Sequence, residues 1–234
     1  LFETILTQPL LNALVWLYNT IPGHDIGVAI VALTVVIRAL LWPLMTQSLK
    51  SQKVMQELQP KLNALKAEHK DNKQAFAQAT MELYKKEKVN PMSSCLPTLL
   101  QLPILFALYW VLQAGLKSEK LNLLYPFVQN PGTIKTVAFG FMDMAKASIP
   151  LAVLAGAAQY VQSRMLYHKK PPMASAAKEG GKDEQMMSMM NKQMLYMMPI
   201  FTVVIGFSLP AGLTLYWFAT TVLMALQQWV VFRK

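Results

Sequence analysis

The stretch IGVAIVALTVVIRALLWPLMT, residues 26–46, decides the fold. Arg38 is its only charged residue, and most of the others are apolar. A helix rises about 1.5 Å per residue, so a run of this length spans about 30 Å, the thickness of the hydrocarbon core of a bilayer. We therefore predict that residues 26–46 cross a membrane as a helix.

Arg38 lies near the middle of this run, at a depth where a charge is costly. On insertion scales a guanidinium at the bilayer centre costs about 2.5 to 3.5 kcal/mol, so water or a counter-charge must accompany it. The other apolar runs of the chain contain no Asp or Glu that could act as a counter-ion. We therefore expect a polar cavity, open to water, to reach Arg38 and to attract anionic groups.

Four further apolar runs indicate a multi-pass protein. They cover residues 93–115, 148–167, 193–208 and 212–232. Hydrophobic residues make up 54% of the 234-residue chain and the mean hydropathy is +0.31, whereas a soluble domain is about 45–50% apolar. The run 193–208 spans only about 24 Å, so we expect neighbouring helices to cover it or the bilayer to thin around it. The predicted fold class is an all-α membrane protein with five transmembrane helices.

Lysine and arginine are distributed unevenly between the connecting segments. Of the 22 such residues, 17 lie in the segments 50–90 and 164–192 and in the last two residues, and only four lie in the connections on the opposite side. The positive-inside rule places the richer group in the cytoplasm. We therefore predict an N-terminus outside and a C-terminus in the cytoplasm, and we read the net charge of +10 as a signal of topology, not of nucleic-acid binding.

The segments outside the spans also show patterns. In residues 1–20, apolar residues at helical spacing predict an amphipathic helix on the outer membrane interface, which Pro9 kinks or delays. Two amphipathic stripes in residues 50–89 predict a cytoplasmic hairpin of two helices, with a bend or break at Pro60. An ordinary solvated helical loop explains the second pattern equally well. The remaining connections are an outer loop, residues 116–146, and a cytoplasmic linker, residues 168–192.

The chain lacks the common motifs of enzymes. It contains no phosphate-binding loop, no HExxH, no dinucleotide fingerprint and no nucleophile elbow. Its single cysteine, Cys95, excludes an intrachain disulfide, and its three histidines show no ligand spacing. We therefore expect no catalytic residues, no cofactor and no metal.

Several polar side chains of the predicted spans are candidates for a site around Arg38. Thr34 lies one turn before Arg38 on the same helix face. Tyr216 and Trp217 could border this polar face, and the polar candidates on other spans are Gln101, Gln113, Gln159, Gln162, Ser163, Thr214, Thr220, Gln227 and Gln228. Taken alone, each glutamine is more often an interhelical hydrogen-bonding residue, and aromatic residues near the end of a span are usually interface anchors. Arg38 differs from them because an amide cannot neutralise its charge.

Strings of residues along nearly the whole chain resemble those of the YidC-type membrane protein insertases. They are VVIR at 35–38, LQPKLNAL at 58–65, ELYKKEKVNP at 82–91, LPTLLQLPILFALYWVL at 96–112, and SLPAGLTLYW at 208–217 followed by Gln227 and Gln228. The resemblance implies a five-helix core in the bacterial plasma (inner) membrane, with an arginine-bearing hydrophilic groove open to the cytoplasm and to lipid.

The resemblance also implies a function and partners. Arg38 would attract acidic residues in the extracellular tail of a nascent membrane protein, and the protein would insert that client and help it to fold without hydrolysing nucleotide. Gln159 or Gln162, together with Trp217, would line the groove. The implied partners are nascent membrane proteins, the Sec translocon, the ribosome or targeting machinery, and membrane lipids.

Two other functions remain open from the residues alone. Arg38 could be the binding charge of an anion-binding secondary transporter, although no coupling carboxylate and no inverted repeat of broken spans is evident. Alternatively, the chain could be a structural membrane subunit whose Arg38 binds lipid phosphate.

Overall fold

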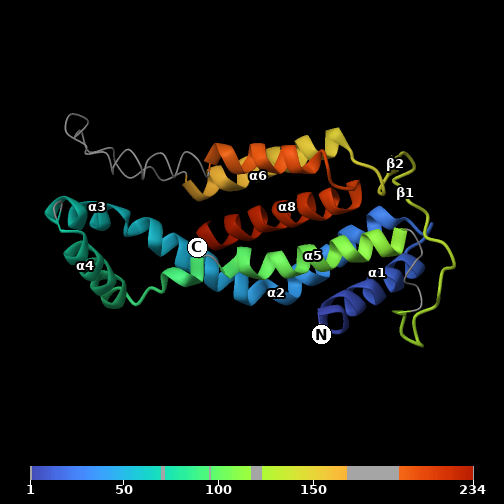
Figure 1. The fold of residues 1–234 in the computed structure, drawn as a ribbon, viewed down its shortest axis with the longest axis horizontal. Helices are drawn as coiled ribbons and strands as arrows, with labels where there is room; N and C mark the ends of the chain where they lie inside the picture. Colours follow the sequence, from blue (N-terminus) through green and yellow to red (C-terminus); the bar gives the residue numbers. More distant parts are fainter. Residues whose placement is uncertain (1, 70–71, 95, 117–122, 168–194, 234) are drawn as a thin grey trace.

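The structure, a computed structural model, is a bundle of helices with a helical pair projecting from one end (Figure 1). It describes residues 2–69, 72–94, 96–116, 123–167 and 195–233. The elements in chain order are a short π-helix (Glu3–Thr7), α1 (Gln8–Thr20), α2 (Ile26–Glu57), α3 (Gln59–Glu68), α4 (Lys73–Lys86), a 3-10 helix (Pro91–Ser94), α5 (Leu96–Leu116), β1 (Val137–Ala138), β2 (Met142–Asp143), α6 (Ile149–Tyr167), a helix over Leu195–Gly206, and α8 (Ala211–Arg233). The predicted linker 168–192 and Cys95 lie outside the described residues.

The arrangement separates the two predicted sides of the membrane. Helices α2, α5, α6 and α8 run along the long axis of the molecule. The α3–α4 pair lies at one end, and β1 and β2 lie at the other, near the start of α2 (Figure 1). The predicted cytoplasmic and outer segments thus occupy opposite ends of the bundle.

Two of the described helices have both the length and the apolar composition to cross a membrane. They are α2 and α8, while Leu99–Gln113 and Leu195–Gly206 are shorter apolar helices. Among the described residues, α5, α6 and α8 begin and end within three residues of the runs predicted from the sequence. The all-α membrane architecture is therefore supported, and the number of five crossings stays a prediction.

Helix α2 continues far beyond the predicted span. It runs for 32 residues without interruption, although Pro43 lies inside it. The helix begins at Asp25, whose Oδ1 accepts hydrogen bonds from the backbone N–H groups of Gly27 (2.8 Å) and Val28 (3.1 Å). It ends at Leu58, where α3 starts with Pro60 in its first turn. Proline fits the first turn of a helix because the backbone N–H that it lacks would have no intrahelical partner there. Pro60 therefore lies inside the start of α3, and the predicted break between the helices lies at Leu58, two residues earlier.

The N-terminal helix packs on the bundle. Leu11, Leu14, Val15 and Tyr18 of α1 are almost fully buried in the main apolar core, which they share with residues of α2, α5 and α8. The expectation of an apolar face turned towards lipid is therefore not met by these four residues. The amphipathic pattern was correctly read as a helix, but periodicity alone does not say whether protein or lipid covers the face.

Side chains of α1 also fasten the chain that follows α5. Asn12 accepts a hydrogen bond from the backbone N–H of Tyr125 (2.6 Å), and its amide donates to the carbonyl of Leu123 (3.1 Å). The hydroxyl of Tyr18 accepts from the N–H of Lys135 (3.0 Å). These bonds hold part of the predicted outer loop against α1.

The same loop contains a short antiparallel strand pair that the sequence did not predict. Val137 pairs with Asp143, and Ala138 pairs with Met142. The second carboxylate oxygen of Asp25 accepts from the backbone N–H of Phe139 (2.6 Å), so the start of α2 is tied to the turn between the strands. Gly27 is required at this contact, because a Cβ there would lie 2.7 Å from Ala138 Cβ.

Glycines allow the helix 195–206 to approach α6 closely. A Cβ on Gly156 would collide with the side chain of Val203, and a Cβ on Gly206 would lie 2.7 Å from the Cβ of Ala152. Small residues at such contacts are typical of packed membrane helices.

Many large apolar side chains on the outside of the bundle are exposed. Representatives are Leu40 (75% exposed), Phe106, Trp110, Phe201 and Trp229. Exposed apolar area of this extent is rare on soluble monomers, and it fits a surface that faces lipid.

Two contacts hold the base of the α3–α4 pair. The hydroxyl of Ser48 on α2 donates to the carbonyl of Ser93 in the 3-10 helix (2.5 Å), and Lys61 of α3 forms an ion pair with Glu87, the residue that follows α4. Lys61 holds the pKa of the Glu87 carboxyl below its usual range, chiefly through their hydrogen bond. Leu58 and Leu62 are buried beside these contacts.

Candidate functional site

Arg38 lies on the face of α2 that is turned towards α8. One of its terminal nitrogens, Nη2, donates a hydrogen bond to Oε1 of Gln227 (3.0 Å). The whole residue is only 5% exposed, and its Nε atom is buried with no hydrogen-bond partner among the described residues. A guanidinium has five N–H donors and no acceptor, so much of its capacity for hydrogen bonding is left unused here.

Gln227 is fully buried and bonded on both sides of its amide. Its Nε2 donates to the backbone carbonyl of Trp42 (2.9 Å) and to the hydroxyl of Thr46 (2.9 Å), both on α2. Arg38 can only donate and the Trp42 carbonyl can only accept. If the Gln227 amide were flipped, its NH₂ group would face the Arg38 donor and its oxygen would face the Trp42 carbonyl. The surroundings therefore fix its orientation, with the oxygen towards Arg38.

No carboxylate of the described residues contacts Arg38. The ion pairs that the structure shows join Lys61 to Glu87 and Lys146 to Asp143, and both lie at the ends of the bundle. Within the described ranges no group of three His, Cys, Asp or Glu side chains could hold a metal ion. Arg38 thus contacts a neutral amide, whereas in an ion pair it would contact a carboxylate.

A second polar contact joins α5 to α8. The amide of Gln101 donates to the hydroxyl of Tyr216 (2.6 Å), and Tyr216 is only 2% exposed. Tyr216 also lies within electrostatic range of Arg38. Gln101 and Tyr216, two of the predicted site residues, are thus joined to each other, and no described hydrogen bond joins either of them to Arg38.

Thr34 is buried as well, but its hydroxyl donates to the carbonyl of Ile30 in its own helix (2.7 Å). A threonine bonded in this way has satisfied its donor locally. Thr34 therefore shares the face of Arg38, as predicted, without a described hydrogen bond to it.

The other predicted site residues are not joined to Arg38. Gln159 and Gln162 of α6 form a long hydrogen bond with each other (3.4 Å), and Trp217 is half-buried on α8. No described hydrogen bond links any of the three to Arg38. Their place in a groove stays a prediction.

Sequence reasoning named Gln227 only as one of many polar neighbours of Arg38, and it left Thr46 out. Thr46 lies two turns after Arg38 on the same face of α2, so helical spacing could have identified it. Nothing in the sequence distinguished Gln227 from the other polar candidates, because the register of α8 against α2 depends on packing along both helices.

The enclosure of Arg38 differs from the open cavity that the sequence predicts. In the structure Arg38 is only 5% exposed, and its guanidinium donates to Gln227. The expected access for water is not seen at this site. An open groove at Arg38 therefore remains a prediction.

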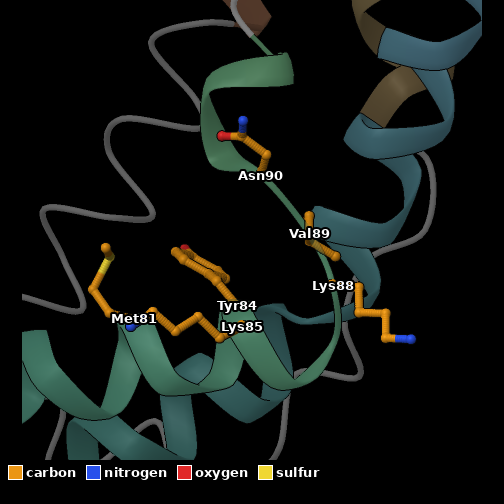
Figure 2. A pocket seen from close by; sticks show the side chains of 6 residues that line it. All are labelled: Met81, Tyr84, Lys85, Lys88, Val89 and Asn90. Atoms are coloured by element: carbon orange, nitrogen blue, oxygen red, sulfur yellow. The ribbon is translucent and has the colours of Figure 1, made fainter.

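Two hollows lie on the cytoplasmic end that the charge distribution predicts. One, of about 280 Å³, is lined by Met81, Tyr84, Lys85, Lys88, Val89 and Asn90, at the point where α4 leads into the next span (Figure 2). Partial burial raises the pKa of the Tyr84 phenol. The other, of about 380 Å³, lies over the seam between α3 and α4. Neither hollow is lined by a residue that contacts Arg38.

Comparison with known proteins gives a consistent result. A family described as 60Kd inner membrane protein matches residues 16–234. The membrane protein insertase YidC of Fusobacterium nucleatum is 33% identical over 223 residues, which cover 94% of each chain. The proteins of the same name from Ectopseudomonas mendocina and Nitrosococcus oceani are 32% and 34% identical, over 100% and 99% of this chain.

The relatives differ in length. The chain spans nearly all of the Fusobacterium protein but only 35% and 37% of the other two. The shared part is the helical bundle that carries Arg38. The match over residues 16–234 and the similarity along almost the whole Fusobacterium protein show that this chain belongs to the 60Kd inner membrane protein family, that of the YidC insertases.

Proposed function

We propose that this chain is a membrane protein insertase and chaperone, which inserts nascent membrane proteins and helps them to fold without nucleotide hydrolysis. The observation that carries the proposal is Arg38, a buried cation bonded to an amide, with no described carboxylate to neutralise it. The printed names of the relatives support the same function.

The charge of Arg38 acts on the part of a client that crosses the membrane least readily. An acidic residue in a short outer tail must pass the hydrocarbon core, and a guanidinium along the way stabilises it. At a separation of about 4 Å and an effective dielectric constant of about 20, the attraction is about 4 kcal/mol. This lowers the barrier, while burial in lipid of an apolar segment of about 20 residues supplies the driving force.

A groove between the helices is the second part of the proposal. In the working state, α2 and α8 separate enough for a client tail to reach Arg38 from the cytoplasm and lipid, and Gln159, Gln162 and Trp217 line that space. The exposed apolar side chains of α5 and α8, such as Phe106 and Trp229, offer a surface along which the client's apolar segment leaves.

The arrangement in the bacterial inner membrane follows from the charge distribution. We place the N-terminus outside and the C-terminus and the α3–α4 pair in the cytoplasm. The exposed lysines of that pair are positioned to meet partners, for which the ribosome or its targeting machinery and the Sec translocon are the candidates.

Reconstitution tests the proposal directly. Purified protein in liposomes should insert a small single-span client with an acidic outer tail, and Arg38→Ala should slow this insertion by at least about tenfold, the effect of about 1.4 kcal/mol. The matched control is Arg164→Ala, because Arg164 lies exposed in the last turn of α6. A normal rate for Arg38→Ala would remove the basis of the mechanism.

Two further variants separate charge from shape. Arg38→Lys keeps the positive charge and should retain a substantial part of the activity, whereas Arg38→Glu reverses it and should be inactive. Equal activities of these two variants would show that the sign of the charge is irrelevant. Chloride and phosphate flux across the same vesicles should be no greater than in protein-free vesicles, and a flux that depends on Arg38 would favour a transporter instead.

A further inference from the structure

Gln227 ties the two longest helices together at the one buried cation described in the bundle. Its Nε2 is held by the Trp42 carbonyl and the Thr46 hydroxyl, and its Oε1 accepts from Arg38 Nη2 (2.9, 2.9 and 3.0 Å). All three partners belong to α2, while Gln227 belongs to α8. The amide thus holds α2 and α8 closed around the guanidinium.

We propose that Gln227 is a positioning residue for Arg38: in the resting protein its amide oxygen occupies the place that a client carboxylate takes during insertion. This inference rests on the proposed function and adds to it a resting partner, which the client must displace.

The exchange is favourable because of what each partner offers to the guanidinium. Gln227 provides one neutral acceptor. A carboxylate provides two charged oxygens, which can accept two parallel hydrogen bonds from a guanidinium and add the attraction between opposite charges. The unpartnered Nε of Arg38 is the second donor that a bidentate contact with a carboxylate needs.

The same exchange accounts for the burial of Arg38. With Gln227 in place the residue is only 5% exposed, so water and small anions do not reach it freely. A client tail that carries a carboxylate compensates for opening the contact between α2 and α8, whereas a neutral tail does not. Gln227 thereby makes access to the cation depend on the charge of the client.

Two substitutions of Gln227 and one matched control test this proposal. Gln227→Glu places a permanent carboxylate on Arg38, and Gln227→Leu removes the competing acceptor at similar volume. The control is Gln228→Leu, because Gln228 is also fully buried on α8 but makes no hydrogen bond among the described residues. Each protein is reconstituted in liposomes and offered one single-span client in two forms, with an acidic outer tail or with the same tail changed to Asn and Gln.

The expected result is a difference between the two clients. Gln227→Glu should slow insertion of the acidic-tailed client by at least about tenfold, on the scale of one lost charged contact, and should change the neutral-tailed client by less than about twofold. Gln227→Leu should lower the concentration of acidic-tailed client needed for half-maximal insertion, and Gln228→Leu should alter neither client. Adding Arg38→Ala to Gln227→Glu should cause no further loss.

A merely structural role for Gln227 gives a different pattern. Both Gln227 variants would then slow both clients equally, in step with a lower unfolding temperature in detergent, and this outcome would overturn the proposal. So would a wild-type rate for Gln227→Glu with the acidic tail. The proposed insertase function fails separately, if wild-type protein inserts neither client or if Arg38→Ala inserts the acidic-tailed client normally.

Discussion

Replacing Asp25 by alanine removes three hydrogen bonds that one carboxylate makes at the N-terminal end of α2. Two of them cap the helix at Gly27 and Val28, and the third holds the N–H of Phe139 at 2.6 Å. Loss of a helix cap costs about 1 kcal/mol. Loss of the bond to Phe139, which is partly exposed to solvent, costs about 1.5 kcal/mol, the lower end of the range for a charged partner.

The sum, about 2.5 kcal/mol, corresponds to a fall in the unfolding midpoint of about 5 to 10 °C for a chain of this size. Asp25→Asn separates the two contributions. An asparagine caps a helix about as well as an aspartate, but its second atom is an NH₂ group, which cannot accept from Phe139. This variant should lose only the second contribution, a fall of about 3 to 6 °C.

The assay is thermal unfolding in detergent, followed by the loss of helical circular dichroism, with wild type and both variants in the same buffer. The reasoning requires the order wild type, Asp25→Asn, Asp25→Ala. If the asparagine variant were as unstable as the alanine variant, the cap would contribute nothing. If neither differed from wild type, the outer turn would not be held by this carboxylate at all.

Three further outcomes follow from the packing and the charges. Gly156→Ala should lower the unfolding midpoint, because overpacking of this kind costs about 1 to 3 kcal/mol, whereas Ala157→Val on the exposed face of α6 should not. Lys61 lowers the pKa of the Glu87 carboxyl, so their ion pair stabilises the protein fully above the ordinary glutamate pKa and is lost as the pH falls through the lowered pKa. The protease sensitivity of α3 and α4 should rise over this fall in pH, and Glu87→Gln should abolish the pH-dependent rise. Tyr216→Phe removes the acceptor for Gln101 and should reduce stability by about 1 to 2 kcal/mol, and an unchanged unfolding midpoint would contradict the buried hydrogen bond.

Local sequence signals predicted the helices well, and they did so for physical reasons. Apolar runs must be helical in a bilayer because each backbone polar group needs a partner within its own segment. The apolar runs that predicted α5, α6 and α8 therefore begin and end close to the bounds of these helices in the structure. The absence of acids from the apolar runs around Arg38 is likewise a property of the sequence.

The structural features that could not be predicted from the sequence depend on contacts between distant segments. The bond from Gln227 to Arg38 crosses 189 positions, and no periodicity within α8 reports the register of that helix against α2. The extension of α2 to Glu57 was missed because the change from apolar to amphipathic composition after Thr46 marks the end of the lipid-facing part, not the end of the helix. The pairing of β1 with β2 uses only two residues on each side, too few for an alternating pattern to be recognised.

The unbroken length of α2 has a mechanical consequence. Its 32 residues make a rod of about 48 Å, which carries the Asp25 cap at one end, Arg38 near the middle and the Ser48 anchor of the α3–α4 base further along. Pro43 removes one backbone hydrogen bond within the rod, but the helix is continuous, so a displacement at one end is transmitted along it. A partner that pushes on α3 would tilt the rod as a lever about its outer cap, and so shift the guanidinium without touching it.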